Sequence, residues 1–208
     1  MKKINWIAAI LSLVLLAGIM CQTTDYIQAK DMQQNIATKV LRFHVRANSD
    51  SKEDQDLKLK VRDAIGSLMA PKLQNVNGLA ECEKIAQNNM KEIVDTANKV
   101  VKSCGYDYPI EVYLKNVDFP DKTYGEYTFP AGNYEALEVI IGSGAGHNWW
   151  CVMYPNMCFA GSVYQVIDKD AKQSLQNTLT KKEYESLVKE KNYKIQFKYL
   201  TFLNKYFE

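Results

Sequence analysis

The residues of this chain that could do chemistry gather between positions 142 and 158. A short loop carries three alternating glycines, and His147 and Cys151 follow it. A cysteine becomes a nucleophile when an imidazole base lies within hydrogen-bond reach. In an extended chain the four residues from His147 to Cys151 span about 13 Å, so the two side chains meet only if the chain turns. An exported hydrolase that uses Cys151 and His147 is the enzymatic hypothesis.

A second hypothesis pairs Cys151 with Cys158 in a disulfide. Cys151 and Cys158 flank a Pro155-Asn156 turn, which brings two short extended pieces together. Closing this loop would stabilise the fold by roughly 2 to 3 kcal/mol in the chain-entropy model. We therefore expect a Cys151–Cys158 disulfide, with two reduced core cysteines as the alternative. A metal site made of His147, Cys151 and Cys158 matches no standard zinc spacing and lacks a fourth ligand, so no metal is predicted.

The glycine loop looks at first like a phosphate-binding loop. A dinucleotide fingerprint needs its third glycine one residue after Gly146 and a helix next, whereas a strand-like aromatic segment follows here. The lysine and hydroxyl residue of a P-loop are also missing. We predict no nucleotide and no cofactor. A flexible or tightly turned connection and a partner-contact loop both remain as interpretations.

Two consecutive tryptophans follow the loop. In a strand, one of Trp149 and Trp150 faces the core and the other faces away. The outward ring either covers the core or anchors a binding partner. Ordering three glycines costs backbone entropy, which favours a segment that adapts to a partner. The candidate partner-binding residues are His147, Asn148, Trp149, Trp150, Asn48 and Asp50.

Asn48 and Asp50 lie where a strand gives way to a helix. Apolar residues alternate with Arg42, His44 and Arg46 across residues 40–47, which predicts a half-buried strand and a partly exposed His44. Asp50 or Ser51 then caps a helix, and Pro71 ends it.

The rest of the chain supplies a second helix and a sheet. An apolar stripe at helical spacing runs from Cys82 to Val101, which predicts a helical hairpin with the first helix. On one continuous helix Cys82 and Cys104 would lie about 33 Å apart, so we expect them to be buried free thiols. Strands are expected at 110–115, 124–129, 134–141 and 149–154, a capping box at Thr180, and an undecided strand or helix at 193–207.

Helices and strands fall into separate blocks, which favours an α+β fold over an alternating α/β arrangement. The expected architecture is one domain with an N-terminal strand, a helical hairpin, a mostly antiparallel sheet and C-terminal helical segments. We place it at residues 30–208, with a core at 40–160 and an extension at 161–208.

The first 29 residues predict export. Lys2 and Lys3 precede an 18-residue apolar run, Ile4 to Cys21, which is typical of a signal peptide or signal anchor. The run reaches about 27 Å as a helix. Because its positive charges come first, the chain from Lys30 onward is expected outside the cytoplasm. A small residue is missing before Cys21, where Met20 stands, so lipidation is not expected.

Composition excludes several classes of protein. The net charge of +2 at pH 7 gives no electrostatic footprint for nucleic acid. A content of 47% hydrophobic and 24% charged residues excludes a disordered chain. Charge is nonetheless distributed unevenly along the chain. Residues 103–168 contain eight acidic residues and only two lysines. This acidic segment is either neutralised within the fold or steers a partner.

Two long blocks of sequence resemble the stage II sporulation protein R family. The first is Leu41-Arg42-Phe43-His44-Val45 with Ala47-Asn48-Ser49-Asp50-Ser51, followed by Asp54-Gln55, Leu57-Lys58 and Val61-Arg62-Asp63-Ala64. The second runs through Thr123-Tyr124-Gly125, Pro130-Ala131-Gly132, Tyr134-Glu135-Ala136-Leu137, Ile141-Gly142 and Gly146-His147-Asn148-Trp149-Trp150-Cys151-Val152 to Pro155 and Cys158-Phe159. Together they cover residues 40–159.

The resemblance implies a signalling protein rather than an enzyme. Members of the family are made in the forespore and exported into the space between the two membranes that separate it from the mother cell. There they trigger a membrane-embedded aspartic peptidase of the mother cell, which processes a sigma-factor precursor. The implied partner is therefore this peptidase, and the N-terminal segment is either removed or keeps the protein in the membrane.

Overall fold

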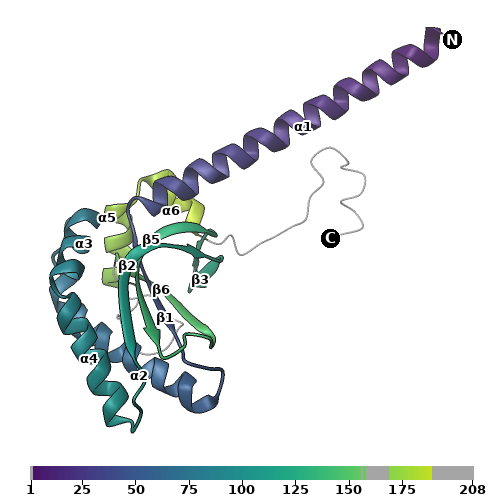
Figure 1. Cartoon of the computed structure of the whole chain (residues 1–208). Coiled ribbons are helices and arrows are strands. Elements are labelled where there is room, and N and C mark those ends of the chain that lie inside the picture. The colour runs from purple at the N-terminus through teal and green to yellow at the C-terminus, as the bar shows by residue number, and fades with distance from the viewer. Residues whose placement is uncertain (1, 156, 158–168, 189–208) are drawn as a thin grey trace.

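A four-stranded mixed sheet forms the centre of the computed structural model, which describes residues 2–155, 157 and 169–188 (Figure 1). The chain order is α1 (Lys2–Ala37), β1 (Leu41–Arg46), α2 (Lys52–Met69), the 3-10 turn η1 (Pro71–Leu73), α3 (Leu79–Asn88), α4 (Met90–Ser103), β2 (Ile110–Phe119), β3 (Lys122–Tyr124), β4 (Tyr127–Phe129), β5 (Gly132–Ile141), β6 (Asn148–Tyr154), α5 (Lys169–Thr178) and α6 (Lys181–Leu187). The expected α+β class is confirmed.

The strand order is β2-β5-β1-β6. β5 is antiparallel to β2 and parallel to β1, and β6 is antiparallel to β1. The segment expected as a strand at 124–129 is instead a small hairpin of β3 and β4, because the chain reverses at Gly125, whose φ is 58°. A positive φ suits glycine, which has no Cβ to clash.

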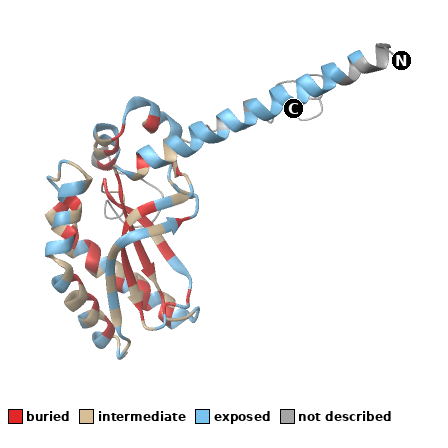
Figure 2. Ribbon diagram, turned by 45° about the horizontal axis from the view of Figure 1, so that its top comes forward, coloured by how far each residue is buried: buried red, intermediate tan, exposed pale blue. Residues whose placement is uncertain are grey.

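Two separate apolar cores lie on the two faces of the sheet (Figure 2). The first core packs α2, α3 and α4 against Phe43, Val45 and Leu137. The second packs the end of α1, the β3–β4 hairpin, α5 and α6 against Ala136 and Val152. β1 is therefore buried on both sides, and its residues from Leu41 to Val45 are all buried. The prediction of a half-buried strand is wrong for this reason.

The helical pair is present, but its second member is broken. α2 begins at a Ser51 cap, whose side chain accepts a hydrogen bond from the Asp54 N–H, and it ends before Pro71 as expected. The stripe expected as one helix is divided at Asn89 into α3 and α4. The Asn89 side chain donates to the Ile85 carbonyl at 2.7 Å, which competes with helix continuation. Cys82 and Cys104 are free thiols as predicted, although only Cys82 is buried.

α1 is longer than the apolar run within it. By length and composition it is the one described helix that could cross a membrane, with a mean hydropathy of 1.6 over its candidate span. It continues without a break to Ala37, and Ile36 is fully buried in the second core. Gln33 donates to the Asn133 carbonyl at 3.3 Å. The last turns of α1 therefore belong to the domain.

The C-terminal expectations are met only where the structure describes the chain. Thr180 forms the predicted capping box with Glu183. Glu183 also accepts from Lys39 at 2.6 Å, which ties α6 to the segment between α1 and β1. Burial raises the pKa of Glu183, but the hydrogen bonds from Lys39 and Thr180 outweigh it, and the pKa lies below its usual value. The segment at 193–207 lies outside the described residues.

Candidate functional site

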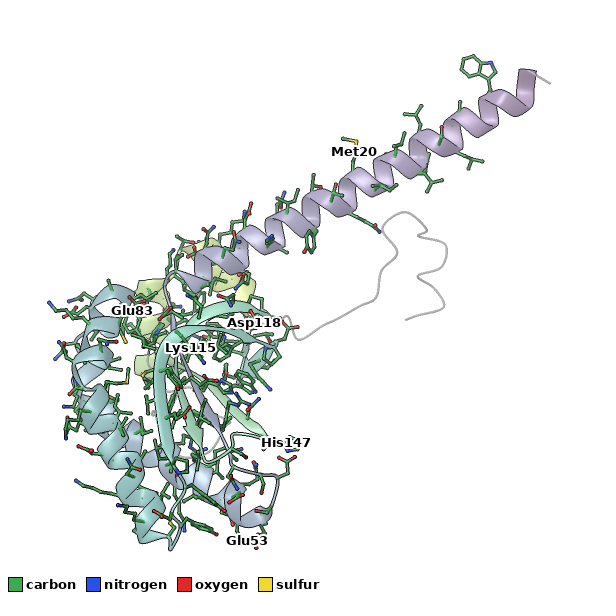
Figure 3. The ribbon with its side chains drawn as sticks, viewed as in Figure 1. Met20, Glu53, Glu83, Lys115, Asp118 and His147 are labelled. Atoms are coloured by element: carbon green, nitrogen blue, oxygen red, sulfur yellow. The ribbon has the colours of Figure 1, made fainter. Side chains whose placement is uncertain are left out.

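Three of the six candidate partner-binding residues, Asn48, Asp50 and His147, meet at one end of the sheet. β1 and β5 are parallel neighbours, so both end at the same edge. The loop after β1 (residues 47–51) and the turn after β5 (residues 142–147) therefore lie against each other. We call these two segments the tip loops. Figure 3 shows His147 at the end of the domain opposite α1.

Asn48 holds the tip loops together. Its side-chain oxygen accepts from the Ser143 N–H at 3.0 Å, and its carbonyl accepts from the Ser143 hydroxyl at 2.7 Å. The same carbonyl accepts from the Ala145 N–H at 3.3 Å. With its polar atoms used inside the fold, Asn48 acts as a positioning residue for the turn rather than as a free contact.

The three glycines are required by close packing. A Cβ at Gly142 would lie 2.3 Å from the Asn48 side chain, and one at Gly146 would lie 2.1 Å from the Ser49 carbonyl oxygen. Gly142 and Gly144 also have φ values of 60° and 62°. The segment is a tight turn, in which the glycines let two backbones approach. Its role as a partner-contact loop stays a prediction.

A buried carboxylate supports the first tip loop. Asp54 is 4% exposed, and it accepts from the Asn48 side chain at 2.9 Å and from the Ser49 hydroxyl at 2.5 Å. Burial raises the pKa of Asp54, but the hydrogen bonds that its carboxylate accepts from Ser49, Asn48 and Tyr108 lower it by a larger amount. The pKa of Asp54 therefore lies below its usual value.

The exposed part of the tip is a pair of side chains, Asp50 and His147. The His147 N–H donates to the Asp50 carboxylate at 2.5 Å, and the imidazole Nδ1 contacts the same oxygen. The two side chains are 55% and 78% exposed. The backbone hydrogen bond from His147 is the main reason why the pKa of Asp50 is lowered. Beneath them, the buried Lys58 donates to the His147 carbonyl at 3.0 Å.

Both tryptophans are packed within the domain. Trp149 lies in the first core, edge-on to Phe43 with ring centroids 5.5 Å apart. Trp150 faces the other side of the sheet, where it stacks on His44 with centroids 3.8 Å apart and meets Phe119 at 4.6 Å. Trp150 is partly buried in the second core. The outward ring therefore covers the core, which is one of the two interpretations, and contact of the tryptophans with a partner stays a prediction.

The arrangement contradicts a cysteine nucleophile. Cys151 is 3% exposed and disulfide-bonded, and a sulfur held in a disulfide is not a thiolate. His147 is exposed and faces Asp50 instead. The predicted partner of Cys151, Cys158, lies outside the described residues, so the Cys151–Cys158 pairing stays a prediction.

Charged residues that the sequence placed at the surface are buried on the second face of the sheet. His44 is 3% exposed, not partly exposed as expected, and its Nδ1 lies 3.4 Å from Glu138 Oε1. Lys115 pairs with the other Glu138 oxygen at 2.6 Å. Burial lowers the pKa of His44 to about 4, although a hydrogen bond from the imidazole to the Asn148 side chain and the charge of Glu138 act in the opposite direction.

Arg42 is the most extreme of these buried charges. It is fully buried, and its guanidinium carbon lies 4.2 Å from the ring centre of Phe119 and 4.8 Å from that of Tyr134. Its Nε donates to the Cys151 carbonyl at 3.0 Å and its Nη2 to the Tyr124 hydroxyl at 3.2 Å. Burial lowers the pKa of Arg42. Glu138, the one charged residue of the run 136–141, is the sequence signal of this buried layer.

Within the described part of the chain, no group of three His, Cys, Asp or Glu side chains could hold a metal ion. A polar cavity of about 840 Å³ lies at the other end of the domain, between the end of α1, residues 74–79 and α5. It includes none of the candidate residues.

These features define a small α+β domain that follows an apolar N-terminal helix, with a polar, hydrogen-bonded tip at its far end. The family model of stage II sporulation protein R matches residues 37–165. The chain belongs to the stage II sporulation protein R family, and its role is therefore in sporulation.

One relative shows the extent of the similarity. The stage II sporulation protein R of Bacillus subtilis (strain 168) is 35% identical over 124 residues, which is 60% of this chain. The chain spans 55% of the length of that relative. No solved structure matches the chain.

Proposed function

We propose that this protein is an extracytoplasmic signalling protein of sporulation. It is exported from the forespore and binds a membrane-embedded aspartic peptidase of the mother cell, which then processes a sigma-factor precursor. Membership of the stage II sporulation protein R family supports the sporulation role. The apolar helix α1 is compatible with a signal or an anchor.

The position of the tip is the observation that carries the proposal. α1 leaves the domain at one end, and His147 lies at the opposite end (Figure 3). A signal between two facing membranes needs a protein whose contact surface points away from its own membrane. With α1 toward the forespore membrane, the tip loops point toward the mother cell.

The chemistry of the tip suits binding. The hydrogen bonds of Asn48 and Asp54 fix the backbone that presents Asp50 and His147. A preorganised surface binds with a smaller loss of conformational entropy. The pair offers a partner one carboxylate and one imidazole, while Cys151 is engaged in a disulfide. The domain acts by contact rather than by turnover.

The test is His147→Ala in the full chain, mixed with the candidate peptidase and its precursor substrate in membranes. The change removes a side chain that is 78% exposed and keeps the backbone N–H that binds Asp50. We expect unchanged thermal melting and a loss of processing of about 30-fold, the effect of losing a contact worth about 2 kcal/mol.

The matched control is Lys52→Ala, which removes an exposed, ion-paired side chain from the neighbouring first turn of α2. It should process the precursor like the unmodified chain. Equal processing by His147→Ala and Lys52→Ala would exclude the tip as the contact surface. If the unmodified chain fails to promote any processing, the proposed function itself is wrong.

A further inference from the structure

β2 is an edge strand of the sheet, and no described strand pairs with its outer side. β5 is its pairing partner, and within residues 2–155, 157 and 169–188 no other backbone hydrogen bond to β2 occurs. The strand is ten residues long. An edge of this length presents unpaired N–H and C=O groups that can add a further strand.

The centre of this edge carries an unusual side chain. Among the described residues outside α1, Tyr113 is the one large hydrophobic side chain that is exposed, at 42%. Its hydroxyl donates to Glu111 at 2.9 Å, and the Lys115 Nζ lies 4.8 Å from its ring centre. Glu111, Tyr113 and Lys115 alternate along the strand and therefore share one face. Figure 3 shows Lys115 on this strand.

We propose that β2 pairs with the β2 strand of a second copy of this chain, antiparallel about a twofold axis through Tyr113. In this register Tyr113 meets its own counterpart, and Glu111 of each copy lies opposite Lys115 of the other. On the reverse face Val112 lies opposite Leu114, both of which are only partly buried in the single chain. Opposite charges and apolar pairs facing each other across strands stabilise such a ladder.

The charges select this register over its neighbours. Shifting the two strands so that Glu111 meets Glu111, or Lys115 meets Lys115, places like charges directly opposite each other, which is destabilising. A shift of two residues in either direction leaves Glu111 and Lys115 without an oppositely charged residue across the two strands. The contact is a single pair of strands, well below the area of a stable interface. The dimer is therefore weak and depends on concentration.

The geometry also separates the two α1 helices. Gln33 of α1 donates to the Asn133 carbonyl, and Asn133 lies opposite Asp118 in the sheet. α1 therefore leaves the domain beside the C-terminal end of β2. The twofold axis puts the two α1 helices at opposite ends of the joined sheet. Copies inserted side by side in one bilayer are not expected to pair in this way.

The first experiment places a cysteine on the axis. Full-length Tyr113→Cys in mild detergent is exposed to an oxidant and resolved on a non-reducing gel. Opposed residues in antiparallel strands have Cα atoms about 4.5 to 5.5 Å apart, which matches a disulfide. We expect a covalent dimer to form at least 10-fold faster than with Asp107→Cys, a position before the strand that is also exposed. The unmodified chain is the background.

The second experiment reverses one charge. Sedimentation equilibrium in the same detergent should show a reversible dimer for the unmodified chain and for Asp107→Lys, but at least 10-fold weaker association for Glu111→Lys. A full chain that stays monomeric at all concentrations, or equal crosslinking at positions 113 and 107, overturns the proposal. Unchanged association of Glu111→Lys also overturns it. Association only after deletion of residues 189–208 would assign the edge to the C-terminal segment of the same chain.

This inference does not depend on the proposed signalling role. The dimer is measured without the peptidase, so either result leaves the processing experiment unaffected.

Discussion

The two faces of the central sheet are both buried along β1 but are built from different chemistry. The face toward α2, α3 and α4 is apolar, with Phe43, Val45 and Leu137 at its centre. The opposite face also excludes solvent, yet it contains Arg42, His44 and Glu138. The first face is stabilised mainly by hydrophobic burial. The second face holds charged groups in place through aromatic rings and ion pairs, and this makes its stability depend on pH.

Replacement of Phe43 by alanine tests the apolar face and should have the largest effect. Phe43 is fully buried and packs edge-on to Trp149. Loss of the ring should lower the free energy of unfolding by about 3 to 5 kcal/mol, from lost transfer energy and the cavity left behind. Urea denaturation measures the change. A loss below about 1 kcal/mol would show that this face is loosely packed.

Acid titration tests the charged face through His44. Its folded pKa is about 4, against 6.5 for an unperturbed histidine. Between these values the unfolded chain binds the proton and the folded chain does not, so stability falls as the pH is lowered from 6.5 to 4. The loss attributable to His44 is on the order of 3 kcal/mol. Urea denaturation at a series of pH values measures it.

The control for that titration is His44→Gln, which keeps a polar side chain without a group that titrates in this range. Its stability should fall less steeply between pH 6.5 and 4 than that of the unmodified protein. If the free energy of unfolding falls equally steeply with pH in the two proteins, His44 does not gain a proton on unfolding.

Substitution of Arg42 by methionine is expected to have the smallest effect. A buried charge is costly to desolvate, and replacing it by an apolar side chain of similar volume is often neutral. Arg42→Met should change the free energy of unfolding by less than about 1 kcal/mol, whereas Arg42→Ala should cost about 3 kcal/mol through its cavity. Thermal and urea unfolding compare the two. Equal, large losses would show that the guanidinium hydrogen bonds stabilise this face.

The contrast between the faces also explains what could be predicted from the sequence. Alternation in β1 correctly placed Phe43 and Val45 on one side and His44 on the other. An alternation with a period of two residues identifies the two faces of a strand. It does not show which elements cover the face that carries the polar side chains. That cover comes partly from the end of α1, next to β1 in the chain, and partly from α5, α6 and the β3–β4 hairpin, which are remote in sequence. Local signals such as the Ser51 cap and the Thr180 capping box were readable, because a few adjacent residues determine them.

The tip was only partly predictable for a similar reason. The candidate set included Asn48, Asp50 and His147, which the structure brings together. Their contact depends on parallel pairing of β1 and β5, whose partners are about ninety residues apart. The roles of Asn48 and Gly146 follow from that distant approach. Neither residue type nor spacing reveals that a backbone carbonyl occupies the place of a side chain at Gly146.

Because α1 runs without a break into the second core, its length sets the distance between the apolar run and the domain. Residues 22–37 of α1 follow the apolar run and rise about 24 Å as a helix, with Ile36 fixed in the domain. In an anchored chain this segment sets both the height of the domain above the membrane and the direction in which it faces. Each residue inserted there would lift the domain by about 1.5 Å and turn it by about 100°. A change of length remote from every contact surface would therefore change what those surfaces can reach.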